Sequence, residues 1–187
     1  MKIGIDLDGV LYDFCAAFRE YLIERHDFNP ARCTPPQRWD FYHDWGLTDW
    51  EFSDLCHHGA DAHALWCRSG PWGGRPVLDA LADIRADGHT VHIITRREFG
   101  SHKAVSALDT ALWLQQHNVP YDTLTFAADK TLLRTDWMLE DNIDNYLQLK
   151  DAGCRAVLMD RPWNRDLADA LRVSSVEAFC SLVGHLA

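Results

Sequence analysis

The sequence predicts an α/β fold with a parallel sheet that is covered by helices on both faces. Short apolar runs typical of strands alternate with amphipathic helical patterns over most of the 187 residues. Such alternation is typical of strand–helix–strand units. One long segment directly after the first strand breaks the alternation, and we interpret it as a small helical cap.

Five segments have the composition of buried strands. The first covers residues 2–7, where Ile3, Ile5 and Leu7 lead into an Asp-Gly pair that favours a turn. The later apolar runs cover residues 90–95, 123–127, 137–140 and 156–159. The polar residues that follow these runs are therefore expected at the carboxyl ends of strands.

The helices of the core are predicted from apolar spacing. Residues 76–87 begin with proline, stop before Gly88, and repeat Leu78, Leu81 and Ile84 at helical intervals. A second pattern runs from Val105 to about residue 118, and a last amphipathic helix covers residues 176–183. Together with the strands, they predict a ligand site at the carboxyl edge of the sheet.

The segment of residues 13–75 contains no convincing strand and is expected to be mainly helical. Phe18 and Tyr21 lie at helical spacing, and Thr48 with Glu51 forms a capping box for a second helix. The proline-rich residues 29–39 are expected to be a loop. We predict a catalytic core of residues 1–12 and 76–187 and a cap of residues 13–75, and we expect Phe18, Tyr21 and Trp50 to pack inside the cap.

The composition limits the classes of function. The chain is 47% hydrophobic and 25% charged, and it has no apolar run that could span a bilayer. Its first residues lack a secretory cleavage pattern, so we expect a cytoplasmic protein. A formal net charge of -10 argues against broad binding to polymeric nucleic acid, so we expect a small substrate.

The six cysteines are scattered without CxxC spacing, and we expect free thiols. A metal site within residues 56–67 is an alternative, because cysteines and histidines gather there. The spacing matches no structural zinc pattern, so a cap helix with surface histidines is preferred. The residues concerned are Cys56, His57, His58, His63 and Cys67.

Asp6 and Asp8 lie at the end of the first strand. Carboxylates are costly to bury there without a compensating cation, so a metal or phosphate site would explain the pair. A turn at Asp8 and Gly9 explains the motif equally well when it is taken alone.

The ends of the later strands favour a site. Thr95 follows the second strand, Lys130 follows the third, and Glu140 and Asp141 end the fourth. A hydroxyl, an ammonium and carboxylates at neighbouring strand ends can converge on one phosphoryl group and one metal. Each residue also has a simpler interpretation, such as a helix cap for Thr95 or a solvated surface lysine for Lys130, but their joint occurrence favours the functional one.

These motifs, in this order, resemble those of the haloacid dehalogenase (HAD) superfamily of aspartate-nucleophile phosphatases. The motifs are DLDGVLYDF at residues 6–14, then Thr95, Lys130 and Glu140-Asp141, and the likeness covers nearly all of the chain outside the cap. The resemblance implies a Rossmann-like fold and phosphomonoester hydrolysis through an aspartyl-phosphate on Asp6. Asp8 would first protonate the leaving oxygen and then deprotonate the attacking water.

The resemblance also implies the ligand sets. Magnesium (Mg2+) would be bound by the Asp6 carboxylate, the Asp8 carbonyl and Asp141. The role of Glu140 is open, and Asp144 and Asn145 compete for the place of an auxiliary acidic residue. The phosphoryl oxygens would be bound by residues at or beside three of the motifs, namely Gly9, Thr95, Arg96 and Lys130.

Within the superfamily, the chain resembles 5'(3')-deoxyribonucleotidases of the cytosolic and mitochondrial type. The likeness depends on the GVLYDF continuation, the position of the cap, and residues 69–76, where the cap returns to the core. It implies that Phe14 and Trp72 form walls of a base pocket and that the substrate is a nucleoside monophosphate, preferably a deoxyribonucleotide. A homodimer is a candidate assembly, since members of this family are often dimers.

Two other functions are alternatives. A phosphatase of polynucleotide 3' ends or of sugar phosphates is one, because Arg96 and Arg97 beside Thr95 could contact further phosphates. A catalytically silent nucleotide-binding module is the other. The intact set of Asp6, Asp8, Thr95, Lys130 and Asp141 disfavours the silent module.

Overall fold

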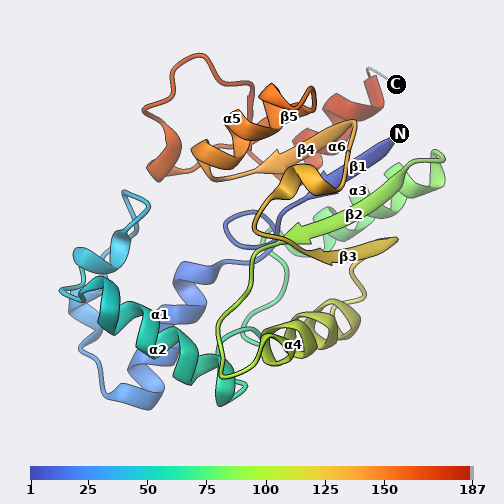
Figure 1. The fold of residues 1–187 in the computed structure, drawn as a ribbon. Helices are drawn as coiled ribbons and strands as arrows, with labels where there is room; N and C mark the ends of the chain where they lie inside the picture. Colours follow the sequence, from blue (N-terminus) through green and yellow to red (C-terminus); the bar gives the residue numbers. More distant parts are fainter. Residues whose placement is uncertain (186–187) are drawn as a thin grey trace. The chain divides into compact units, whose positions relative to one another are not determined.

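The computed structural model describes residues 1–185 (Figure 1). Contacts divide the chain into two compact units. Unit 1 contains Met1–Asp13, Gly70–Arg96 and the chain from His117 onward, and unit 2 contains Phe14–Ser69 and Arg97–Gln116. Residues 97–116, which we expected in the core, therefore group with unit 2. The functional division into a catalytic core and a cap stays a prediction.

Unit 1 is built on a six-stranded sheet in which every neighbouring pair is parallel. The strand order is β3-β2-β1-β4-β5-β6, so β1 lies between β2 and β4, and Ile3 pairs with both Val91 and Trp137. The residues that follow β1 consequently emerge between the carboxyl ends of two other strands. The strands are β1 Lys2–Ile5, β2 Thr90–Thr95, β3 Thr123–Phe126, β4 Trp137–Glu140, β5 Arg155–Met159 and β6 Arg172–Val173.

Helices pack on both faces of this sheet, as predicted. In β4, Trp137 contacts Phe179 of α6 with ring centroids 6.4 Å apart. The next residue, Met138, lies in a buried cluster with Tyr146 and Leu149 of α5. Because successive side chains of a strand point to opposite faces, α6 and α5 cover different faces. The helices of unit 1 are α3 Arg75–Ala86, α5 Ile143–Asp151 and α6 Val176–His185.

The predicted strands are confirmed with small shifts of their bounds, but β6 was not predicted. A strand of two half-buried residues is too short to show a periodic pattern, so nothing in the sequence indicates it. Within residues 1–185, no helix combines the length and the apolar character needed for a bilayer span.

Unit 2 is helical, and no strand occurs in residues 14–69, as expected. Phe18 is buried and stacks on Trp45, with ring centroids 6.1 Å apart, and Tyr21 is buried beside it. Arg97 is also buried, with its guanidinium 4.4 Å from the centre of the Trp66 ring, so this arginine is part of the packing of unit 2. The main helices are α1 Phe14–His26, α2 Asp49–Asp61 and α4 Lys103–Gln116, with short 3-10 helices η1 Pro30–Arg32 and η2 Phe41–His43.

The prediction that Trp50 is a core residue was wrong, because 72% of it is exposed. In α2 the buried residues are Cys56, Gly59 and Ala60. Trp50 lies six residues before Cys56 and nine before Gly59, which places it about 120° and about 180° around the helix from these two buried residues. Cys56 is buried while His57 and His58 are exposed, which agrees with a cap helix that carries surface histidines. None of the six cysteines forms a disulfide within the described residues.

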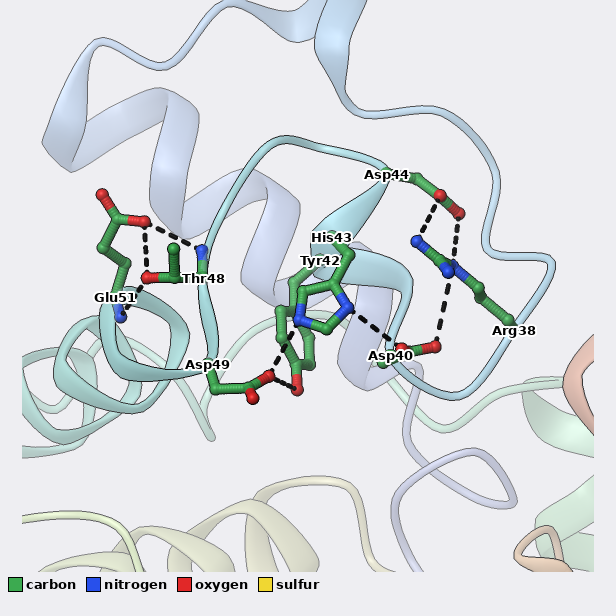
Figure 2. A network of polar contacts seen from close by, with 8 residues as sticks. All are labelled: Arg38, Asp40, Tyr42, His43, Asp44, Thr48, Asp49 and Glu51. Carbon is green, nitrogen blue, oxygen red and sulfur yellow. Dashed lines mark hydrogen bonds and ion pairs between the residues drawn. The ribbon is translucent and has the colours of Figure 1, made fainter.

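A polar network organises the chain before α2 (Figure 2). The predicted capping box is present, since the Thr48 hydroxyl accepts from the Glu51 amide and the Glu51 carboxylate accepts from the Thr48 amide. One carboxylate oxygen of Asp49 lies 2.8 Å from both the Tyr42 hydroxyl and a ring nitrogen of His43. These contacts connect η2 to the first turn of α2.

We expect Thr48→Ala to lower the free energy of unfolding by about 1 kcal/mol, because it removes the side-chain cap of α2. Thr48→Ser keeps the hydroxyl and is the matched control. Urea unfolding followed by circular dichroism measures both variants. Equal losses for Ala and Ser would show that the hydroxyl does not stabilise α2.

Candidate active site

The chain makes a tight loop directly after β1. The Asp6 amide nitrogen donates to the Leu139 carbonyl oxygen at 3.1 Å, and this hydrogen bond keeps Asp6 beside β4. The next residues turn sharply, since the amides of Val10, Leu11 and Tyr12 all donate to the Leu7 carbonyl. This loop leaves Asp6 at the carboxyl edge of the sheet with only 5% of its surface exposed.

Lys130 lies at the start of the 3-10 helix η3 (Lys130–Leu132) and is 4% exposed. Its Nζ is 2.8 Å from Asp6 Oδ1 and also contacts Glu140 Oε1. Lys130 is therefore a buried cation shared by two carboxylates, and the interpretation as a solvated surface lysine is wrong.

Glu140 has its hydrogen-bonding capacity filled by protein donors. Its Oε2 accepts from the amides of Asp141 (2.9 Å) and Asn142 (3.0 Å). Its Oε1 accepts from Asn145 Nδ2 (2.9 Å) and from Lys130. A carboxylate with four such contacts has no lone pair directed elsewhere, so Glu140 is suited to positioning its neighbours rather than to binding a metal.

Asp141 lies next to the loop that follows β1. Its Oδ2 accepts from Trp163 Nε1 at 3.1 Å. Gly9 has a φ of +78°, and a Cβ at that position would lie 2.0 Å from Asp141 Oδ2. The glycine is thus required both by its backbone conformation and by the close approach of a carboxylate.

The carboxylates form the one cluster with metal-binding potential among residues 1–185. Ligand atoms of Asp6, Glu140 and Asp141 lie within 4.8 Å of one another, and all three residues are buried. Because protein donors already saturate Glu140, Asp6 and Asp141 are the two carboxylates suited to an ion. The cysteine and histidine alternative in residues 56–67 forms no comparable cluster in the described chain.

The electrostatics of this cluster fit a divalent cation. The pKa of Asp6 is raised to about 7, chiefly by burial. The charge of Lys130 acts to lower it, and the charges of Glu140 and Asp8 act to raise it. Burial, followed by the charge of Glu140, raises the pKa of Asp141 well above its ordinary value. Burial lowers the pKa of Lys130, but the charges of Asp6 and Glu140 outweigh burial and raise this pKa above the usual range. The cluster holds three buried carboxylates and one ammonium, so a hard cation would neutralise the excess negative charge.

The remaining predicted phosphate ligands differ in their surroundings. Thr95 ends β2 and is 1% exposed, and its hydroxyl oxygen has no hydrogen-bond partner in the described chain. An unpaired buried hydroxyl is uncommon and suits a polar ligand. Arg96 is exposed. The Gly9 amide donates to the Tyr12 carbonyl at 2.9 Å, so it is used within the loop and gains no support as a phosphate donor.

The two candidates for an auxiliary acidic residue are separated by the structure. Asn145 donates to Glu140, whereas Asp144 is exposed in the first turn of α5. Asn145 therefore acts on the ion-pair cluster through Glu140. A ligand role for either residue stays a prediction.

The two predicted walls of the base pocket are both half-buried. Phe14, in unit 2, packs against four aromatic rings, of which Trp66 is the nearest at 5.6 Å between centroids. Trp72, in unit 1, lies under the guanidinium of Arg161, whose carbon is 3.6 Å from the ring centre. A base pocket shared by Phe14 and Trp72 stays a prediction.

Sequence reasoning missed the segment that follows β5. Arg161, Trp163 and Asn164 contact Gly9 or Asp141 directly. These residues lie in an irregular stretch that includes the 3-10 helix η4 (Pro162–Asn164), and no periodic pattern marks it. The one available signal was their place directly after a strand, at the same edge of the sheet as the other candidates.

Residues 1–185 match a family model described as "5' nucleotidase, deoxy (Pyrimidine), cytosolic type C protein". The chain belongs to this family. A relative from Chlorobaculum tepidum, named "Putative 5'(3')-deoxyribonucleotidase", is 30% identical over 176 residues, which cover 92% of this chain and 85% of that protein. The family is one of nucleotidases, so the protein is an enzyme, a phosphatase of the nucleotidase type.

Solved structures support the HAD fold of this nucleotidase. A haloacid dehalogenase-like hydrolase from Streptococcus pneumoniae matches with a TM-score of 0.63 at 15% identity, over 100% of this chain and 98% of that one. A structure from Lactobacillus delbrueckii subsp. bulgaricus, titled "putative phosphoglycolate phosphatase", matches with a TM-score of 0.64 at 11% identity, over 97% of each chain. The predicted fold class is therefore confirmed.

We expect Gly9→Ala to lower nucleotidase activity by at least about 100-fold, because the new Cβ would displace the Asp141 carboxylate from its place beside the loop. Gly88→Ala is the matched control, since Gly88 also has a positive φ (+85°) but nothing lies within 4 Å of the point that a Cβ would occupy. Both variants bear backbone strain of about 1 to 2 kcal/mol.

Phosphate release and thermal unfolding should be measured for both glycine variants. Similar losses of stability with loss of activity only in Gly9→Ala are expected. Full activity of Gly9→Ala would show that the close approach of Gly9 and Asp141 is not needed for catalysis.

Proposed function

We propose that this nucleotidase hydrolyses nucleoside monophosphates, preferably deoxyribonucleotides, in a Mg2+-dependent reaction through an aspartyl-phosphate on Asp6. The observation that carries the proposal is the buried cluster of Asp6, Lys130, Glu140 and Asp141 at the carboxyl edge of the sheet. Membership of the 5' nucleotidase family supports the substrate class.

Asp6 is suited to the role of nucleophile because the Lys130 ammonium lies 2.8 Å from its Oδ1. This contact orients the carboxylate and favours its ionised form beside an anionic substrate. In the first step, Asp6 attacks phosphorus, the bond from phosphorus to the ester oxygen breaks, and the leaving nucleoside oxygen takes a proton from Asp8. The products are the nucleoside and the aspartyl-phosphate.

In the second step, a water molecule attacks phosphorus and gives a proton to Asp8. The bond between Asp6 and phosphorus breaks, phosphate is released, and both aspartates return to their starting states. Asp8 lies two residues after the nucleophile and is half-buried, which leaves it accessible to a proton-transfer partner. Its role comes from the resemblance of the DLDGV motif.

The carboxylates of Asp6 and Asp141 and the carbonyl of Asp8 would hold Mg2+. When bound, the ion would neutralise charge that develops on the phosphoryl oxygens and keep Asp6 ionised. Lys130 and the Thr95 hydroxyl, with Arg96 as a further candidate, would bind the phosphoryl group. Phe14 and Trp72 would contact the base. A cytoplasmic location and a homodimer stay predictions from the sequence.

We expect Asp6→Asn to lower kcat by at least about 1,000-fold, since an amide cannot replace the carboxylate as nucleophile. Asp151→Asn, at an exposed position in the last turn of α5, is the matched control and should retain wild-type activity. Phosphate release from p-nitrophenyl phosphate with Mg2+ measures both. An Asp6→Asn enzyme within tenfold of wild type would show that Asp6 is not the nucleophile.

We expect deoxyribonucleoside monophosphates to be cleaved with a kcat/KM roughly 10- to 100-fold above that of sugar phosphates, because one aromatic stacking contact to a base contributes about 1 to 3 kcal/mol. The purified protein should be assayed against both classes and against ribonucleotides. Chelation of Mg2+ should abolish all cleavage, and added Mg2+ should restore it. A sugar phosphate as the best substrate would refute the substrate class while the chemistry on Asp6 stands.

A further inference from the structure

Residues 161–164, with the sequence RPWN, follow β5 and carry no role in the proposed reaction. The segment reaches the site from the side opposite to β2 and η3, since β5 neighbours β4 in the sheet. Three of its four side chains make hydrogen bonds to the loop after β1 or to Asp141.

Asn164 connects the ends of two strands. It is fully buried, and its Nδ2 donates to the carbonyls of Asp141 and Met159, both at 2.8 Å. Its Oδ1 accepts from the Arg161 amide (3.3 Å) and from the Arg172 guanidinium. Both donors and both acceptor sites of the amide are used, so the residue is held in one orientation. Asn164 therefore fixes the backbone of Asp141 against the end of β5.

Trp163 contacts the side chain of Asp141, whose backbone is held by Asn164. Its Nε1 donates to Asp141 Oδ2 at 3.1 Å. An indole has one polar hydrogen and accepts no hydrogen bond, so this contact favours the ionised carboxylate. Two consecutive residues thus hold Asp141 at its carbonyl and at its carboxylate.

Arg161 contacts the loop that carries Asp6 and Asp8. Its Nε donates to the Gly9 carbonyl at 2.7 Å, and its guanidinium lies on the ring of Trp72. The Trp72 amide in turn donates to the Leu11 carbonyl at 2.7 Å. Arg161 and Trp72 together brace both ends of the Gly9 to Leu11 stretch.

We infer that residues 161–164 form a clamp that positions Asp141 and the Gly9 loop relative to each other. Trp163 and Asn164 orient Asp141, and Arg161 orients the loop. The distance between Asp141 and the Gly9 loop therefore depends on one short segment. The inference rests on the proposed function, because Asp141 and the Asp8 carbonyl are the proposed Mg2+ ligands. Loss of a hydrogen bond to a metal ligand typically lowers metal affinity roughly 10- to 100-fold.

The test is Mg2+ binding to full-length Trp163→Phe, measured by isothermal titration calorimetry without substrate. The substitution keeps an aromatic ring and removes the indole N–H. The Kd for Mg2+ should rise roughly 10- to 100-fold, while the thermal midpoint in chelator stays within about 2 °C of wild type. Trp50→Phe, at an exposed position in α2, is the matched control and should leave the Kd unchanged.

Arg161 gives a second, independent readout. Arg161→Ala should lower kcat more than it raises KM, because it loosens the Gly9 loop, which carries the proposed reacting groups. Arg161→Lys should restore part of kcat, because lysine supplies one donor and a cation to the same place. An unchanged Mg2+ Kd in Trp163→Phe, whether or not stability falls, would overturn the clamp. If wild-type protein binds no Mg2+, the proposed metal site itself is wrong, and the clamp falls with it.

Discussion

The site depends on a single buried ammonium that is shared by two carboxylates. Lys130 comes from η3, Asp6 follows β1 and Glu140 ends β4, so three separate strands must be in place before the charges can meet. Each charge would be costly to bury alone, and together they compensate one another only with good geometry and further donors. The amides of Asp141 and Asn142 and the side chain of Asn145 supply those donors to Glu140. The parallel sheet therefore serves to bring charged groups to one edge in fixed positions.

Two adjacent acidic residues, Glu140 and Asp141, have different environments and different tasks. Every lone pair of Glu140 faces a protein donor, whereas the Asp141 carboxylate accepts one hydrogen bond within residues 1–185, from Trp163, and lies close to the backbone at Gly9. Successive side chains of a strand point to opposite faces, so Glu140 and Asp141 at the end of β4 point in different directions. The result is one carboxylate that organises the lysine and the amides, and one that is left with capacity for a ligand. The distinction follows from hydrogen-bond partners that the sequence does not display.

The sequence predicted the sheet, and it predicted that the candidate site residues gather at the carboxyl edge, because both follow local rules. Apolar runs mark buried strands, and polar residues such as Thr95 and Asp141 directly after those runs must gather at one edge. What escaped prediction depends on contacts between distant residues. Residues 161–164 and Arg172 of β6 act through hydrogen bonds, which leave no periodic signal. Trp50 was mispredicted because its aromatic side chain suggests burial, whereas its position lies away from the buried stripe of α2.

The clamp after β5 ties the site to two distant parts of the chain. Asp6, the proposed nucleophile, lies close to the first residue, whereas the segment that braces its loop lies more than 150 positions later, and Arg172 beyond it contacts Asn164. Contacts with such large sequence separation carry an entropic cost, because the intervening chain must be closed into a loop. A chain that lacks residues 161–172 in their folded place would hold Asp6 and Asp8 without these supports. On the proposed function, hydrolysis therefore requires that both distant parts of the chain are folded together.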